Sequence, residues 1–400
     1  MENNEDISKL EVLNIGIVGH IDHGKTTLLH RMTGKWTDTH SEELKRGITI
    51  KLGYADAIIR KQGSEFNIEK GNPVRYITFV DAPGHEMLMA TMLSGAAIMD
   101  AAVLVIAANE GIKPQTREHL IALKAKNIKN VIIVQNKIDL ITKEQAKKSY
   151  EDIKKFIKGT IAENSQIIPV SAQQGINIDK ILEELTKIPI PQRNLKEKPC
   201  FVIARSFDIN RPGTGIDKLS GGILGGSLKQ GTLKIGDEIE IKPGINYKEQ
   251  NQIKYESVKT RIMGLQRGAH PIKEATPGGS LAIQTALDPS VTKADSLAGC
   301  VASLQGQLAD ITSKVKIKFH LFKEILGSTE KSPVENIRSN EMLLLSINTA
   351  ITVGTVLSAR DDEAELILKI PVVPFKGENI GIARNIKGHW RLIGYGELIQ

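Results

Sequence analysis

The sequence predicts an α/β domain with a mostly parallel sheet and helices on both faces, followed by two β-barrels. Up to about residue 190, short apolar runs that read as buried strands alternate with helical segments, as in a parallel sheet. The segment Ile188–Pro191 interrupts this pattern, and the polar stretch Asn194–Lys198 reads as a linker. Beyond the linker, helical periodicity gives way to short alternating strands with glycine turns, which favours barrels.

Length and composition agree with a globular, cytoplasmic protein. The 400 residues are enough for about two to four domains with cores of their own. The two cysteines, Cys200 and Cys300, provide neither a disulfide framework nor a metal-ligand cluster, which suits a reducing cytosol. The acidic start Met1–Asp6 lacks the apolar core of a signal peptide. No apolar run approaches the roughly 20 residues of a membrane span, so we expect no membrane partner.

The net charge of +7 is compatible with a nucleic-acid partner but does not establish one. The lysine-rich stretch Lys147–Lys158 shows why. Its apolar residues Tyr150, Ile153 and Ile157 recur at helical spacing, so the lysines are predicted to form a solvated helix face rather than an RNA site.

The first expected strand, Val12–Val18, leads into a glycine-rich loop. The loop, Gly19–Thr26, fits the pattern G-x-x-x-x-G-K-[ST], and Thr27–Met32 continues with a helical pattern. In such a loop the backbone N–H groups and the helix N-terminus cradle phosphates. Lys25 would reach the β- and γ-phosphates, and the Thr26 hydroxyl would bind Mg²⁺. The strand–loop–helix context disfavours the alternative of a glycine turn with an incidental lysine.

A second motif follows the expected strand Tyr76–Val80. Asp81 ends this strand, so its carboxylate lies at the sheet edge where ligands gather, and it would hold Mg²⁺ through a water. The Gly84 N–H is placed to contact a γ-phosphate. His85 begins the amphipathic stretch Glu86–Met99, and we favour a role in orienting the attacking water. The alternative is a surface or packing histidine.

A third motif, Asn136–Asp139, follows the strand Val131–Val134 and would read the base. The Asp139 carboxylate accepts hydrogen bonds from N1–H and the exocyclic amine of guanine. Adenine would leave that carboxylate facing an acceptor, at a cost of about 1–3 kcal/mol or more. Ser171 and Ala172, after the strand Ile167–Val170, would add a backbone contact to the guanine oxygen.

These motifs together predict a GTPase with Mg²⁺ as cofactor. The residues assigned to the nucleotide are Asp22, His23, Gly24, Lys25, Thr26, Thr27, Asn136, Lys137, Asp139, Ser171, Ala172 and Gln173. The predicted domain limits are 1–193, 198–304 and 310–400. In the first barrel, Leu233–Ile241 is expected to form a hairpin around Gly236-Asp237. In the second, Val315, Ile317, Phe319 and Leu321 alternate with polar residues, and the barrels are expected to meet between Ser303 and Thr312.

A GTPase domain followed by two β-barrels is similar to the translational GTPases that carry aminoacyl-tRNA. Arg46–Ile50 resembles their first switch, which implies that Thr49 binds Mg²⁺ in the GTP state. The continuation Lys51–Asp56 resembles the gamma subunits of archaeal and eukaryotic initiation factor 2. So do the segments His85–Gly95, Ala204–Asn210, Gly221–Gly226, Leu287–Lys293 and Trp390–Gly396. The resemblance runs nearly end to end, and the lack of eukaryotic-type extensions points to the archaeal form.

The resemblance implies a GTP-dependent carrier of methionyl initiator tRNA to the small ribosomal subunit, which releases the tRNA on hydrolysis. It implies a heterotrimer, with an alpha subunit on the first barrel and a beta subunit on the GTPase domain. It also implies that Tyr54, Arg205 and Phe207 lie near a pocket for the aminoacylated tRNA end. For Tyr54 the alternative is an ordinary strand aromatic.

In the same family Asp22 and Gly47 are implied in a second Mg²⁺ site, although Asp22 is equally explained as an acceptor that stabilises its loop. The metal-binding set is thus Thr26, Thr49, Asp22, Gly47 and Asp81, and the set for hydrolysis is His85, Thr49, Gly84 and Asp22.

The sequence departs from the family in one segment. Members commonly carry a zinc knuckle of two C-x-x-C pairs soon after the first switch. Here Lys61–Pro73 contains neither cysteine nor histidine, so no zinc is expected and a short hairpin is predicted in its place.

Three other readings remain open. A selenocysteine-specific elongation factor shares the switch sequence but usually adds an RNA-binding domain after the barrels, whereas this chain ends at Gln400. A GTPase module of a sulfate-activating enzyme would need an adenylyltransferase partner and would not bind charged tRNA. A binding module that has lost hydrolysis is disfavoured by Thr49, Gly84 and His85.

Overall fold

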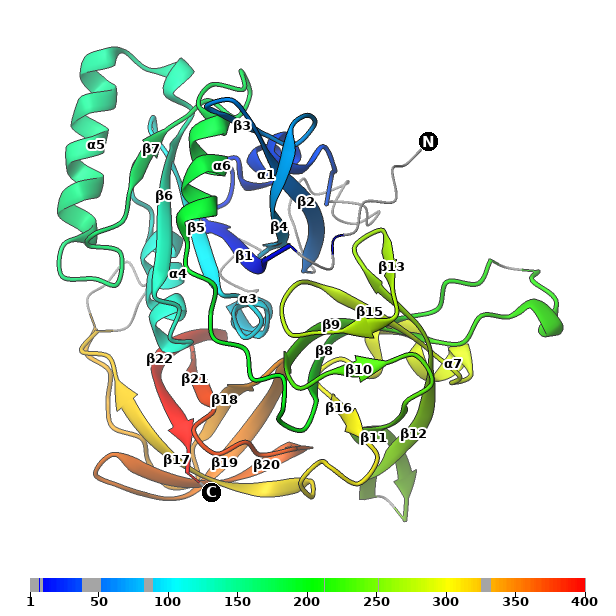
Figure 1. The fold of residues 1–400 in the computed structure, drawn as a ribbon. Coiled ribbons are helices and arrows are strands. Elements are labelled where there is room, and N and C mark those ends of the chain that lie inside the picture. Colours follow the sequence, from blue (N-terminus) through cyan, green and yellow to red (C-terminus); the bar gives the residue numbers. More distant parts are fainter. Residues whose placement is uncertain are drawn as a thin grey trace.

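The structure is a computed structural model that describes residues 7, 10–37, 52–82, 89–211, 213–250, 252–324 and 332–399. An α/β domain lies above two barrels, one formed by strands β8–β16 and the other by strands β17–β22 (Figure 1). The predicted fold class is confirmed. None of the helices in the described ranges is long and apolar enough to cross a membrane.

The sheet of the α/β domain has the strand order β3-β2-β4-β1-β5-β6-β7. Strands β4, β1, β5, β6 and β7 are parallel, whereas β2 and β3 add an antiparallel edge. The strands are β1 (Val12–Gly19), β2 (Gly53–Gln62), β3 (Glu65–Asn67), β4 (Asn72–Asp81), β5 (Ala101–Ala107), β6 (Asn130–Asn136) and β7 (Ile167–Pro169).

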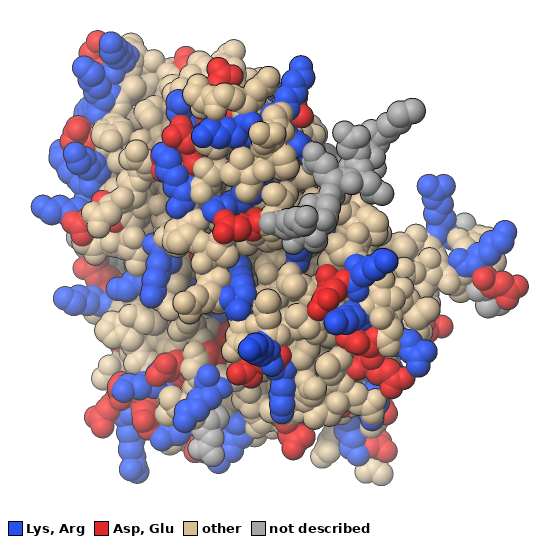
Figure 2. Space-filling view, viewed as in Figure 1, with Lys and Arg blue, Asp and Glu red and all other residues tan. Residues whose placement is uncertain are grey.

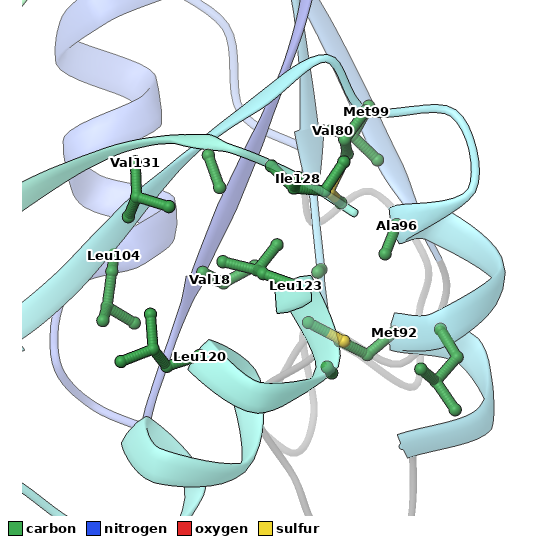
Figure 3. Close-up of a cluster of buried hydrophobic side chains, with 14 of the residues drawn as sticks. Val18, Val80, Met92, Ala96, Met99, Leu104, Leu120, Leu123, Ile128 and Val131 are labelled. Carbon is green, nitrogen blue, oxygen red and sulfur yellow. The ribbon is translucent and has the colours of Figure 1, made fainter. Parts of the chain in front are cut away.

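Helices cover both faces of this sheet. The helices are α1 (Lys25–Thr33), α3 (Met89–Ala96), α4 (Pro114–Ala125), α5 (Lys143–Ile157) and α6 (Ile178–Lys187), and a short 3₁₀ turn spans Ile138–Leu140. Apolar residues of α1 and α6 pack on one face and those of α3, α4 and α5 on the other. Figure 3 shows Met92 and Ala96 of α3 and Leu120 and Leu123 of α4 directed toward sheet residues such as Val18 and Leu104. Helix α5 buries Ile153 and Ile157, and its lysines lie on the solvated face that the sequence predicts.

The first barrel closes because β11 pairs with both β16 and β12, which completes the ring β11-β16-β8-β9-β15-β12. Its elements are β8 (Cys200–Phe207), β9 (Ile223–Gln230), β10 (Leu233–Lys234), β11 (Glu238–Glu249), β12 (Gln252–Arg267), β13 (His270–Ile272), β14 (Glu274–Ala275), β15 (Leu281–Thr285), α7 (Pro289–Thr292) and β16 (Val301–Leu304), with 3₁₀ turns at Ile216–Lys218 and Lys293–Asp295.

The second barrel is closed in the order β17-β20-β19-β18-β21-β22. Its strands are β17 (Thr312–Leu321), β18 (Met342–Ile347), β19 (Ala350–Arg360), β20 (Glu363–Val372), β21 (Asn379–Ile386) and β22 (His389–Leu398). In β17 the alternation predicted from the sequence buries Val315 and Ile317 in the barrel core.

The hairpin predicted at Leu233–Ile241 is wrong. Strand β10 pairs with β14, whereas β11 pairs with β12 and β16. The Gly236 N–H donates to the carbonyl oxygen of Ile262 in β12. The turn therefore directs β11 to pair with β12 instead of folding it back onto β10. Ile235, an apolar residue that a hairpin with one buried face would cover, is consequently 48% exposed.

A hairpin forms where the family resemblance would place a zinc knuckle, as the sequence predicts. Strands β2 and β3 pair antiparallel around Gly63, whose φ of 62° suits glycine. Phe66 and Ile68 pack against the core on the α6 side, beside Ile178. An apolar contact therefore holds this edge of the sheet.

Both barrels lie against the α3–α4 side of the α/β domain. The apolar cluster that contains Met92 and Leu120 continues into Val202 and Val301 of the first barrel and Leu392 of the second. Each barrel also has a core of its own, and this shared apolar contact fixes both barrels relative to the edge of the sheet where the sequence motifs lie.

Candidate functional site

The glycine-rich loop joins the end of β1 to the start of α1, as the sequence predicts. Gly24 has a φ of 87°, a left-handed conformation that glycine adopts without strain. A Cβ at this position would come within 2.4 Å of the Asn136 side-chain nitrogen. Lys25 is buried and its ammonium donates to the His20 carbonyl oxygen at 2.9 Å. The loop thus curls back over its own lysine.

Asn136 ties this loop to the base-reading segments. Its side-chain nitrogen donates to the His23 carbonyl oxygen at 2.9 Å, and its side-chain oxygen accepts the Ala172 N–H at 3.0 Å. Both bonds are buried. The structure therefore brings three of the predicted segments, from three separate loops, to one point at the carboxyl ends of the parallel strands.

Lys137 and Asp139 complete the base-reading turn. Lys137 has a left-handed backbone with φ of 62°, which starts the turn Ile138–Leu140 and leaves Asp139 exposed. The Lys137 ammonium lies 3.3 Å from the Glu110 carboxylate. This contact fixes the Lys137 side chain beside the segment that follows β5.

Arg31 connects α1 to the last predicted segment. Its guanidinium donates to the carbonyl oxygens of Ala172 at 2.9 Å and Gln173 at 2.6 Å. The Ser171 hydroxyl accepts the Gln174 N–H at 3.1 Å and so stabilises the same loop. The predicted residues Asp22 and Thr27 lie in the glycine-rich loop and the first turn of α1, respectively. Asp22 is exposed, with a left-handed φ of 61°.

Side-chain oxygen atoms that could bind a metal ion lie close together at the carboxyl end of β4. The Thr26 hydroxyl donates to the Asp81 carboxylate at 3.2 Å, and the Thr37 hydroxyl donates to the same oxygen at 2.8 Å. Asp81 itself is fully buried. A carboxylate with hydroxyl groups is a donor set that suits Mg²⁺, so these residues fit the metal that the motifs imply.

The predicted residues Gly47, Thr49, Gly84 and His85 lie outside the described residues. Their roles in Mg²⁺ binding and hydrolysis stay predictions.

Two histidines, His23 within the glycine-rich loop and His119 beside it, are buried and uncharged. The His23 side chain has Nδ1 3.2 Å from the Val105 carbonyl oxygen and Nε2 3.9 Å from the Glu110 carboxylate. His119, from α4, accepts the Gly19 N–H at its Nδ1 at 2.9 Å. Burial lowers the pKa of His23 to about 4 and that of His119 to about 3.

These lowered pKa values predict a loss of stability in mild acid. Below pH 6.5 an unfolded chain protonates both histidines while the folded chain does not, so stability falls as the pH drops toward the folded-state pKa values. Each histidine contributes about 1.4 kcal/mol per pH unit in that window. We expect His119→Asn, which removes one of the two titrating groups, to narrow the gap between urea unfolding midpoints at pH 7 and pH 5. If the difference between the two midpoints is the same in wild type and His119→Asn, the lowered pKa of His119 does not contribute to the pH dependence of stability.

A second site lies between the α/β domain and the first barrel. A pocket of about 420 Å³ is lined by Tyr54 and Asp56 of β2, Arg205 and Phe207 of β8, Gly225 and Gly226 of β9, Gly268, Ser280, Leu281 and Ala282. The three residues that the resemblance associates with the tRNA end, Tyr54, Arg205 and Phe207, are thus brought together. Their role remains a prediction.

The walls of this pocket are held by bonds within each domain and by two bonds, Arg205 to Leu52 and Ser280 to Asp56, that cross the domain boundary. Arg205 donates to Asp295 at 2.8 Å and to the Leu52 carbonyl oxygen at 3.3 Å. Asp56 accepts the Thr78 hydroxyl at 2.5 Å and lies 3.3 Å from the Ser280 hydroxyl. Burial raises the pKa of the Asp56 carboxyl.

Four residues of the nucleotide site were missed by sequence reasoning: Arg31, Thr37, Glu110 and His119. Arg31 and His119 lie inside helices and resemble any other helix residue in the sequence. Thr37 follows α1 without a motif, and Glu110 follows β5 without one. For Glu110 there was a usable signal, because it stands just beyond the carboxyl end of a parallel strand.

Family models match two parts of the chain. Residues 10–190 match the elongation factor Tu GTP binding domain, and residues 313–398 match the C-terminal part of initiation factor eIF2 gamma. Curated relatives match nearly end to end. The translation initiation factor 2 subunit gamma of Thermococcus onnurineus is 48% identical over 99% of both chains. That of Methanococcus aeolicus is 51% identical over 97% of this chain and 98% of the relative.

Solved structures share the fold at lower identity. A bacterial selenocysteine-specific elongation factor superposes with a TM-score of 0.77 at 24% identity, over 97% of this chain but only 58% of that longer chain. The elongation factor SelB from Methanococcus maripaludis, in complex with the GTP analogue GPPNHP, gives a TM-score of 0.74 at 24% identity, over 98% of this chain and 79% of that one. At this identity the likeness shows the fold alone.

Proposed function

The chain belongs to the family of translation initiation factor 2 gamma subunits, and on that premise we propose that it carries methionyl initiator tRNA to the small ribosomal subunit in its GTP form and releases it after hydrolysis. It is a translational GTPase. The selenocysteine-specific factors are only distant structural neighbours.

The observation that supports the cargo is the pocket between β2 and the first barrel. Phe207 is 38% exposed at the pocket, so its ring is open to stacking by a terminal base. The Tyr54 hydroxyl is buried and has no hydrogen-bond partner among the described residues. Burial raises the pKa of this hydroxyl, which therefore stays protonated and able to donate to a ligand. Arg205 adds a positive charge that Asp295 holds in place.

On the face drawn in Figure 2, basic and acidic side chains are interspersed. The net charge of +7 is thus not gathered into one continuous basic surface on that face. A built pocket with an aromatic, an arginine and an unsatisfied hydroxyl is the better candidate for binding the end of a tRNA.

For the nucleotide we propose that Lys25 contacts the β- and γ-phosphates, that Asp139 reads guanine and that Thr26 and Asp81 hold Mg²⁺ together with Thr49. The metal would neutralise phosphate charge. Gly84 would sense the γ-phosphate, and His85 would orient the attacking water. Loss of the γ-phosphate on hydrolysis would release the segment that contains Gly84 and His85, which would lower the affinity for tRNA. A second metal site at Asp22 and Gly47 is part of the same proposal.

Family membership implies a role in a translation initiation complex. We propose that the complex is a cytoplasmic heterotrimer, in which an alpha subunit binds the first barrel and a beta subunit binds the α/β domain. Co-purification of the tagged chain with both subunits from native extract is the expected result.

The cargo is tested by binding. With a non-hydrolysable GTP analogue, methionyl initiator tRNA should bind more tightly than uncharged initiator tRNA or an elongator methionyl-tRNA. Phe207→Ala should weaken this binding about tenfold, because a base stacked on an aromatic ring contributes about 1–3 kcal/mol. Filter binding measures both effects.

Leu357→Ala serves as the control, since Leu357 is 44% exposed on the second barrel and belongs to neither site. It should leave the affinity for tRNA unchanged. Equal binding of all three tRNAs would refute the proposed cargo, and equal binding by Phe207→Ala would remove the pocket from it.

A further inference from the structure

Helix α4 lies between the glycine-rich loop and the second barrel. It packs against β1 on the sheet side and against β21 and β22 on the barrel side. Figure 1 shows α4 at the lower edge of the α/β domain, directly above these two strands. Two consecutive residues of this helix make buried polar contacts in the two directions.

His119 makes the contact with the loop. Its Nδ1 accepts the backbone N–H of Gly19, the last residue of β1 and the first of the loop, in a buried hydrogen bond of 2.9 Å. His119 is 1% exposed, and it must be neutral with its proton on Nε2 to act as an acceptor. Burial, reinforced by Lys25, His20 and His23, lowers its pKa to about 3, so the neutral form persists at physiological pH.

Glu118 makes the contact with the second barrel. Its carboxylate lies 3.2 Å from the Arg391 guanidinium of β22, and both side chains are largely buried. Just beyond the helix, Lys126 donates to the carbonyl oxygens of Ser346 at 3.0 Å and Asn379 at 3.1 Å. The helix is therefore fixed to the barrel at its middle and at its end.

We propose that α4 couples the seating of the second barrel to the nucleotide site, with His119 as a positioning residue for the phosphate loop and the Glu118–Arg391 pair as the contact that sets the helix. The inference rests on nucleotide binding by the loop and is independent of the proposed tRNA cargo. Consecutive helix residues point in directions about 100° apart, so Glu118 can contact the barrel while His119 contacts the loop. Because both residues belong to one helix, a shift of α4 on the barrel moves His119 relative to Gly19.

The conformation of the glycine-rich loop should depend strongly on the hydrogen bond between the Gly19 N–H and His119. The Gly19 N–H is buried, and a Cβ on Gly19 would come within 2.4 Å of the Val105 carbonyl oxygen, so the residue is closely confined. When the acceptor moves away, the loop must either bury an unpaired N–H or rearrange, and we expect nucleotide affinity to fall about tenfold.

The role of His119 is tested with two variants of the full-length chain. His119→Leu removes the acceptor and should speed dissociation of fluorescently labelled GDP about tenfold in stopped-flow measurements. His119→Asn places an oxygen near the position of Nδ1 and should restore dissociation to within about twofold of the wild-type rate, because it keeps the acceptor. A merely structural role would not be rescued by this change. Equal dissociation rates for wild type and His119→Leu would overturn the assignment.

The coupling is tested from the barrel side. Arg391→Met should also speed GDP dissociation although Arg391 belongs to β22 of the second barrel, and in the His119→Leu background it should add less than about twofold. Glu118→Gln, which keeps the shape of the side chain, provides the same test if Arg391→Met folds poorly. Arg384→Met is the matched control, since it removes a comparably buried ion pair with Glu341 inside the same barrel and should not alter the rate.

If neither Arg391→Met nor Glu118→Gln changes dissociation in folded protein, the coupling is refuted. The same conclusion follows if their effects add fully to that of His119→Leu. Labelled GDP is the only ligand in these measurements, so their failure is distinguishable from a failure of the tRNA proposal, which is measured with charged tRNA.

Discussion

Asp139→Asn is expected to change the preferred base of the nucleotide site from guanine to xanthine. The carboxylate lies in the turn Ile138–Leu140, exposed, and no described residue forms a hydrogen bond or ion pair with it. It is therefore available to accept from guanine N1–H and the exocyclic amine. An asparagine amide instead directs a donor at the position of that amine, where xanthine carries a carbonyl oxygen.

The expected effect is large because hydrogen bonds to a charged group are lost and a donor is placed against a donor. We expect affinity for GDP to fall at least about 100-fold and affinity for xanthosine diphosphate to rise correspondingly. Competition against labelled GDP measures both. Asp179→Asn, which makes the same charge change on the surface of α6, should leave both affinities unchanged. Retention of GDP affinity by Asp139→Asn would remove Asp139 from base recognition.

The nucleotide site was predictable where its residues are contiguous in the sequence. The loop after β1, the aspartate that ends β4 and the segment after β6 each follow an apolar strand of the same parallel sheet. Because the carboxyl ends of those strands meet at one edge, the order of the motifs alone predicts that they converge. The structure confirms that they converge, because Asn136 bonds to His23 and the Thr26 hydroxyl donates to Asp81.

Residues that reach the site from within a helix were not predictable. Arg31 and His119 bond to backbone groups, and a backbone group carries no residue type that a sequence pattern could match. The failed hairpin after Leu233 has a related cause. Its alternation and its glycine turn are local signals, whereas the choice of β12 over β10 as the partner of β11 depends on how the barrel closes.

The second barrel was predictable as a barrel but not as part of the nucleotide machinery. Nothing in the sequence of β22 marks Arg391 as a partner of Glu118, since 273 residues separate them. Such contacts exist because both barrels pack against the α3–α4 side of the α/β domain through one apolar cluster. A site assembled from loops is thus supported by residues that only the tertiary structure identifies.

Asn136→Leu is expected to disable the site while preserving the fold. Asn136 is 2% exposed, and leucine has the same branching and the same number of side-chain heavy atoms, so the change removes two buried hydrogen bonds without opening a cavity. The His23 carbonyl oxygen and the Ala172 N–H would both lose their partner. Each unpaired group costs about 1–3 kcal/mol, or about 2–6 kcal/mol together, and we expect GDP affinity to fall about 100-fold or more because the phosphate loop and the base loop are no longer joined.

Gln135→Leu is the matched control for this prediction. Gln135 is the preceding residue of β6, equally buried, and its side chain donates to the Ala146 carbonyl oxygen of α5 at 2.9 Å, on the other side of the strand. Both variants should lower the unfolding midpoint, because each leaves buried polar groups unsatisfied, but only Asn136→Leu should weaken GDP binding. Asn136→Asp keeps the acceptor for Ala172 and loses the donor to His23, so its affinity should fall between those of wild type and Asn136→Leu. If Asn136→Leu and Gln135→Leu bind GDP equally well, the two loops do not depend on Asn136 for nucleotide binding, and the site must be held together by the Arg31 contacts to Ala172 and Gln173 instead.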